Sequence, residues 1–141
     1  MRPLLVIAIK LMLISGLFAQ QSELAVSIGG LIYDKGKVFV AVYNSANGFP
    51  ENQNATIYKG TFSVINKKCT FKLALPAGTY AIAVFFDENN NQKLDKNIVG
   101  YPKEKFGFSN NPKIVFSAPT FDQCGVVLAN NEQKKIEILL R

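Results

Sequence analysis

The chain has 141 residues, a formal net charge of +6 and no histidine. The missing histidine excludes Ser-His and Cys-His nucleophile pairs, His-ligated zinc and the commonest general base of enzymes. The lysines are scattered, with no basic run interleaved with aromatic residues, so we expect no nucleic-acid partner.

Residues 1–19 have the order of a secretory signal peptide. Arg2 gives a positive start, residues 4–18 are apolar except for Lys10, and small residues end at Ala19. This apolar run is shorter than the ~20 residues that cross a bilayer. We therefore predict a signal peptide at 1–19 and a periplasmic or secreted domain at 20–141 without a stable membrane span. An uncleaved N-terminal anchor is the alternative.

Short apolar segments with alternating patterns fill the predicted domain. They predict strands around 24–28, 37–43, 57–65, 69–75, 79–86, 114–116, 124–128 and 136–140. The first two are predicted to form a hairpin around Asp34-Lys35-Gly36. The segments 37–43 and 79–86 are apolar on both faces and are predicted to be central, with Ile82 or Val84 nearly fully buried. Together the segments predict an all-β fold, a single antiparallel β-sandwich of about seven or eight strands.

The two cysteines, Cys69 and Cys124, are each in phase with large apolar neighbours in the predicted strands. Both are therefore predicted to point into the same core. An even number of cysteines in an exported protein permits one disulfide. A Cys69–Cys124 bridge and two buried free thiols are both compatible with the sequence.

An oxygen-rich segment follows the most apolar strand. Asp87, Asn89, Asn91 and Asp95 occupy positions one, three, five and nine of a twelve-residue calcium loop, and Lys93 at position seven could offer its carbonyl. The spacing predicts a weak calcium site at which these five groups converge. Gln92 and Ile98 replace the usual glycine and the closing glutamate, and Glu104 is the nearest carboxylate that could fold back. The alternative is a turn in which Asn and Asp side chains bind their own backbone.

The segment 100–111 carries Tyr101, Glu104, Phe106 and Phe108 among glycines and lysines. Exposed aromatic residues with a polar rim would form a binding surface. Alternatively, the rings fold down and close the open end of the sandwich, together with Phe116, Pro119 and Phe121.

Three stretches carry a resemblance to a known family. They are 43–50 (YNSANGFP), 75–80 (LPAGTY) and 80–111, which includes FFDENNNQKLD at 85–95, GYPKE at 100–104 and FGFSNN at 106–111. They resemble the exported bacterial proteins catalogued as domain of unknown function 2141. The LPAGTY turn also resembles that of transthyretin-like sandwiches. The resemblance implies export and one β-sandwich, transthyretin-like or immunoglobulin-like, and it supplies no catalytic residues. Phe86 and Gln92 depart from the family's usual His and Gly.

These observations leave three hypotheses. The first is a non-enzymatic module that binds a protein or envelope component through the loops of residues 87–111, with calcium ordering them. The second is a hydrolase that uses carboxylates of the same loop. The third is a structural envelope domain whose loops only cover the core. An exposed aromatic patch favours the first, whereas a deep pocket flanked by Asp87 and Glu104 favours the second.

Overall fold

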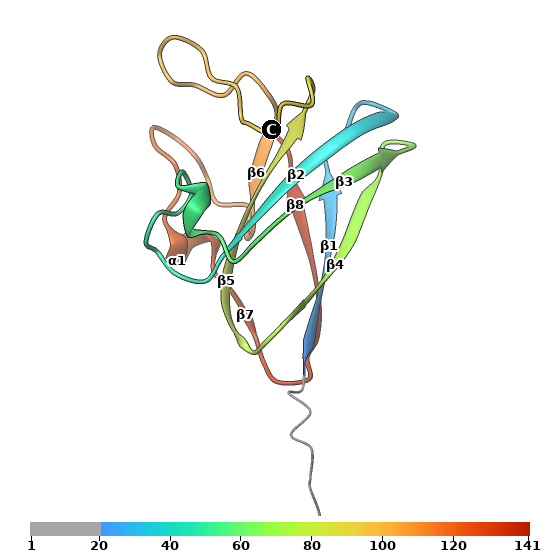
Figure 1. The fold of residues 1–141 in the computed structure, drawn as a ribbon, viewed down its shortest axis with the longest axis vertical. Coiled ribbons are helices and arrows are strands. Elements are labelled where there is room, and N and C mark those ends of the chain that lie inside the picture. Colours follow the sequence, from blue (N-terminus) through green and yellow to red (C-terminus); the bar gives the residue numbers. More distant parts are fainter. Residues whose placement is uncertain (1–20) are drawn as a thin grey trace, which may run out of the picture.

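Two β-sheets packed face to face make up the part of the chain that the computed structural model describes, residues 21–141 (Figure 1). The predicted signal peptide at 1–19 lies outside the described residues. The strands are β1 (Ser22–Gly29), β2 (Lys35–Tyr43), β3 (Tyr58–Ile65), β4 (Cys69–Leu75), β5 (Gly78–Asp87), β6 (Phe106–Phe108), β7 (Val126–Leu128) and β8 (Gln133–Leu139). The helical turns are η1 (Gln53–Ala55) and α1 (Phe121–Cys124). The predicted all-β sandwich is thus confirmed for residues 21–141.

The smaller sheet has the order β4-β1-β8, and the larger has the order β3-β2-β5-β6, with β7 pairing with the start of β5. All the pairs are antiparallel except β1 with β8, which is parallel, so the fully antiparallel prediction is wrong at this pair. The predicted hairpin of 24–28 with 37–43 is also wrong, because β1 and β2 belong to different sheets. Gly30, with a φ of +79°, follows β1 and lets the chain leave the smaller sheet.

The main core lies between the two sheets. Its side chains alternate along β1 and β4, whereas β2 buries every residue from 38 to 43 and β5 buries all but Ala83 from 80 to 87. Ile82 is 0% and Val84 2% exposed, which confirms the prediction made for β5. Burying such a side chain contributes about 1.5–3 kcal/mol of favourable transfer free energy.

A second hydrophobic cluster covers the outer face of the larger sheet. Its buried members are Phe39, Ala41, Tyr43, Ala81, Phe85, Phe106, Phe108 and Cys124. The segments 44–57, 88–105 and 109–125 lie over this face, on the left in Figure 1. The two-sided burial of β2 and β5 therefore comes from two separate apolar layers. The strand expected at 114–116 is absent from the described structure. The segment Phe106–Phe108, which was not predicted as a strand, forms β6 at the edge of the larger sheet.

The cysteines lie in different layers. Cys69 belongs to the core between the sheets, whereas Cys124 belongs to the outer cluster, and both are free thiols. The prediction that they face one core is wrong, and the structure contains no bridge between them. The reason is that Cys124 is the last residue of α1 and does not belong to the strand β7. The alternation of side chains along a strand therefore does not place Cys124 on the same face as Val126. Burial raises the pKa of each thiol to about 11.

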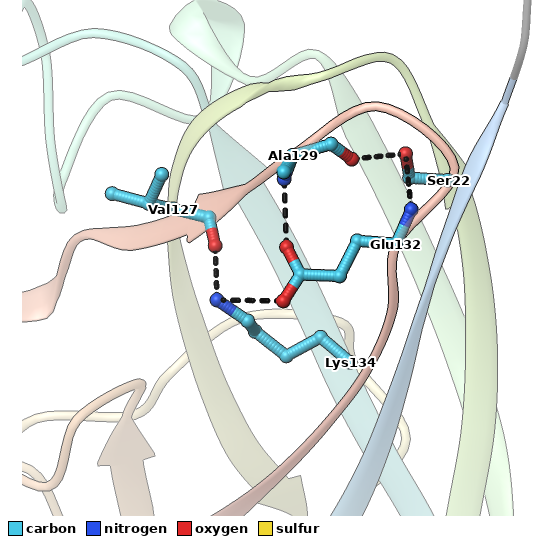
Figure 2. A network of polar contacts seen from close by, with 5 residues as sticks. All are labelled: Ser22, Val127, Ala129, Glu132 and Lys134. Carbon is cyan, nitrogen blue, oxygen red and sulfur yellow. Dashed lines mark hydrogen bonds and ion pairs between the residues drawn. The ribbon is translucent and has the colours of Figure 1, made fainter.

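A polar network fixes the turn between β7 and β8 (Figure 2). The Ser22 hydroxyl donates to the Ala129 carbonyl at 2.5 Å and accepts from the Glu132 N–H at 3.3 Å. The Glu132 carboxylate accepts the Ala129 N–H at 2.7 Å, which lowers its pKa, and it pairs with Lys134 at 3.3 Å. Lys134 also donates to the Val127 carbonyl. The network ties the start of β1 to the turn that leads into β8.

The opposite side of the sandwich is closed by β6 and the end of β8. The Phe106 N–H donates to the Arg141 carbonyl at 3.2 Å, and the Arg141 N–H donates to the Phe106 carbonyl at 3.0 Å. Asn111 extends this contact, because its side chain donates to the Glu137 carbonyl and accepts the Leu139 N–H.

Within residues 21–141, helices that are long and apolar enough to cross a membrane are absent.

Candidate functional site

The loop of residues 88–105 begins at a buried carboxylate. Asp87 ends β5 and is 3% exposed. One of its oxygens accepts the Asn91 N–H at 3.1 Å and the other accepts the Gln92 N–H at 2.9 Å. Gln92, at the place of the usual glycine, has a φ of +60°. The sequence around Asp87 therefore folds as a tight Asx-type turn.

A second buried carboxylate ties the two halves of the loop together. Glu104 is 5% exposed, and its Oε1 and Oε2 accept the N–H groups of Glu88 at 3.0 Å and Asp95 at 3.1 Å. The sequence named Glu104 as the carboxylate that could fold back onto this loop, and the structure places it there. Buried carboxylates that accept backbone N–H groups are costly to replace, so Glu104 is a structural part of the loop.

The side chains of the predicted calcium ligands lie together and hydrogen-bond with one another and with the backbone of the loop. The amide nitrogens of Asn89 and Asn91 donate to the Asp95 carboxylate, at 2.5 Å and at 3.1 and 3.3 Å. The Lys93 N–H donates to the Asn91 side-chain oxygen at 2.9 Å. Within residues 21–141 we find no group of three or more His, Cys, Asp or Glu side chains that could hold a metal ion. The geometry is that of a hydrogen-bonded turn, because an Asn-rich loop supplies enough N–H donors for its own carboxylates.

Residues 106–109, in the segment predicted to carry a binding surface, are buried. Phe106 and Phe108 are each 9% exposed and pack in the outer cluster, so they cover a sheet face rather than the open end of the sandwich. The Ser109 hydroxyl accepts the Ile82 N–H and donates to the Cys124 carbonyl. Of the four residues predicted to form a binding surface, Tyr101 alone is well exposed, at 65%.

A cleft of about 450 Å³ opens on the outer face of the larger sheet. The rings of Phe39, Tyr43 and Phe85 rise from β2 and β5, and those of Phe106 and Phe108 from β6. Phe39 stacks on Phe85 with ring centroids 5.0 Å apart. The floor is therefore a rigid aromatic surface held by paired strands.

Loops from distant parts of the sequence form the walls of the cleft. They contribute Pro50, Leu94, Tyr101, Pro102, Val115 and Phe116. The Tyr43 hydroxyl donates to the Pro50 carbonyl at 2.9 Å and so fixes the first wall to β2. Phe116 was expected in the cover with Phe121, but it is 100% exposed, whereas Phe121 packs in the outer cluster.

Charged side chains stand at the mouth of the cleft. Glu51 and Lys96, from opposite walls, form an exposed ion pair at 3.8 Å, and Lys93 also lines the cleft. An exposed pair of this kind is worth at most about 1 kcal/mol. Within residues 21–141 the Lys93 ammonium has no ion-pair partner, so the mouth has a net positive charge.

Sequence reasoning named three residues of this cleft, Tyr101, Phe106 and Phe108, as part of a binding surface. It missed the rest of the floor and two of the walls. It identified Phe39 and Tyr43 only as parts of a central strand, and it placed Val115 and Phe116 in a strand. The signal that was present is the apolar character of both faces of 37–43, which requires a second layer of cover. The loop positions of Pro50 and Phe116 leave no periodic pattern from which the cleft could be found.

No curated protein and no solved structure matches the chain. One family model does match, over residues 26–137, and its description is an uncharacterized protein conserved in bacteria (DUF2141). The match spans both sheets, the loop of residues 88–105 and the walls of the cleft. The chain therefore belongs to the DUF2141 family.

Proposed function

We propose that the protein is an exported, non-enzymatic binding module whose site is the cleft on the outer face of the larger sheet. The observation that carries the proposal is an open, aromatic-lined cavity of about 450 Å³, a size within the range of small-molecule sites. Export is supported by the order of charge, apolar run and small residues at 1–19.

The lining indicates the chemistry of the bound group. Five rings at the floor favour an apolar, ring-bearing or aliphatic group, because such surfaces bury apolar area and stack with other rings. Lys93 and Lys96 at the mouth favour a negative charge at the outer end of that group. The ligand that fits best is thus an apolar body that ends in an anionic group.

The position of the buried carboxylates favours binding over hydrolysis. Neither Asp87 nor Glu104 is among the residues that line the cleft, and each accepts two backbone N–H groups. A carboxylate-based hydrolase would need one of them to face the bound substrate.

The proposal is tested with anilinonaphthalene sulfonate, a fluorescent aromatic anion with the expected chemistry. We expect the folded protein to bind it with a several-fold increase in dye emission, free of tryptophan background since the chain has none. Ala83→Leu, which fills the floor beside Phe108, should abolish the increase, whereas Ala74→Leu on the exposed face of β4 should not. Equal emission from both variants, or no binding by the wild type, would overturn the proposal. Melting curves show that each variant is folded.

We also propose that a calcium ion orders the loop of residues 88–105. Asp87, Asp95 and Glu104 have no cationic partner within residues 21–141, and binding would require the Asn89 and Asn91 amides to turn their oxygens inward. Calcium at ten times its dissociation constant should then raise the free energy of unfolding by about 1.4 kcal/mol and the melting temperature by several degrees. Asp87→Asn should abolish this rise. Identical melts in millimolar calcium and in chelator would show that the loop is only a hydrogen-bonded turn.

A further inference from the structure

Two neighbouring loops expose large apolar side chains to an unusual degree. Ile98 and Val99, on the loop that carries Tyr101, are 106% and 85% exposed. Val115 and Phe116, on the next loop, are 72% and 100% exposed. Tyr101 and both residues of the second loop line the same cleft, so the two loops stand together at its mouth.

Hydrogen bonds within the loop hold Ile98 and Val99 in their exposed positions. Asn97 and Tyr101 are joined by a backbone hydrogen bond of 2.8 Å, and a β-bridge pairs Lys96 with Pro102. The Asn97 side chain also accepts the N–H groups of Val99 and Tyr101, at 3.1 and 2.9 Å. The loop therefore ends in an ordered tip whose two apolar side chains have nothing to pack against within residues 21–141.

Lysines outnumber carboxylates on these two loops. Lys93 and Lys103 lie on the same loop, together with Lys96, which pairs with Glu51, and Lys113 precedes Val115 on the next loop. Of the carboxylates between residues 87 and 105, Asp87 and Glu104 are buried, Asp95 is partly covered, and Glu88 is exposed. The outward charge of the two loops is thus positive, with apolar side chains at the most exposed points.

We propose that these two loops dock on an anionic lipid surface. Ile98, Val99 and Phe116 would enter the interfacial region, Tyr101 would lie at headgroup level, and the lysines would face lipid phosphates. A flat protein surface covers one side of a projecting residue, whereas a deformable lipid interface encloses a side chain that is exposed on all sides. Docking in this way would turn the mouth of the cleft toward the membrane, although it does not depend on what the cleft binds.

The test places a polarity-sensitive dye at the tip of the loop in the full chain. Ile98→Cys supplies the attachment point, and the native Cys69 and Cys124 are protected by being 3% and 0% exposed. The matched control is Val127→Cys, because Val127 is 62% exposed on β7, at the lower end of the molecule in Figure 1 and away from the loop of residues 88–105. Residues 1–20 are the same in every variant, and they join the fold at Ser22, whose polar network includes Val127, so vesicle binding through them would act first on the label at position 127.

With vesicles containing phosphatidylglycerol, we expect the emission of the label at position 98 to rise several-fold and shift to the blue. The shift should be much weaker with pure phosphatidylcholine and at high salt, which screens the lysines. Adding Val99→Asp should lower the inserted fraction of the label at least about tenfold, because a carboxylate is costly to place near hydrocarbon. No shift at position 98, or equal shifts at positions 98 and 127, would overturn the proposal. Loss of dye binding in the cleft with the vesicle shift intact would overturn only the proposed function.

Discussion

Ser109→Ala is expected to lower the free energy of unfolding by about 2–4 kcal/mol. Ser109 is 0% exposed, and its hydroxyl accepts the Ile82 N–H at 2.9 Å and donates to the Cys124 carbonyl at 2.5 Å. Removing it leaves a buried donor on the central strand and a buried acceptor at the end of α1. Each unpaired buried group costs about 1–3 kcal/mol. Denaturant titration followed by circular dichroism measures the loss.

The matched control is Ser63→Ala. Ser63 is exposed on β3, and its hydroxyl makes no hydrogen bond within residues 21–141. We expect a change within about 0.5 kcal/mol for this variant. Similar losses for the two alanine variants would show that the bridge made by Ser109 contributes little to stability.

Gly107→Ala is expected to lower the free energy of unfolding by about 2–3 kcal/mol, the upper part of the range for overpacked sites. A Cβ at this position would lie 2.5 Å from the Leu139 carbonyl oxygen and 3.0 Å from a methyl of Ile138. The first neighbour is backbone and cannot rotate away. Relief would have to come from separating β6 from β8, at the expense of the paired hydrogen bonds between Phe106 and Arg141.

Gly125→Ala provides the comparison for Gly107. A Cβ there would meet a Thr79 methyl at 3.2 Å, and its nearest backbone neighbour would be 3.5 Å away. Since a side chain can shift by a few tenths of an ångström, we expect a loss below about 1 kcal/mol. An equal or larger loss at position 125 would contradict the view that contact with β8 is what requires glycine at 107.

The segments quoted for the family resemblance turn out to be mostly scaffold. The Tyr80 hydroxyl donates to the Pro76 carbonyl at 2.8 Å, which explains the Pro-Ala-Gly-Thr-Tyr turn as a tyrosine corner. Asn110 and Asn111, with φ values of +63° and +47°, donate from their side chains to Gly125 and Glu137. The spacing of polar residues in 106–111 thus serves contacts with α1 and β8, which no local pattern could reveal.

The calcium-like spacing of residues 87–95 shows the same limit. The sequence predicted that Asp87, Asn91 and Asp95 lie close together in one loop, and their hydrogen bonds agree with that proximity. It could not say whether their oxygens would face an ion or the backbone, because both uses require short polar side chains at alternate positions. Glu104 accepts the N–H of Glu88, 16 residues earlier in the chain, and the pairing of β5 with β6 brings it back to the loop.

The sequence by itself determined which segments are strands and which of their side chains are buried. The apolar patterns predicted seven of the eight strands to within a few residues, all but β6, and the two-sided apolar character of β2 and β5 marked them as central. These properties are local, since they follow from the period of two along an extended chain. The sequence did not determine which element covers each face. Tertiary structure decided the parallel pairing of β1 with β8, the separation of Cys69 from Cys124 and the position of the cleft. The reason is that the hydrophobic effect is non-directional, so an apolar side chain can pack against any apolar neighbour and its sequence pattern does not identify which one.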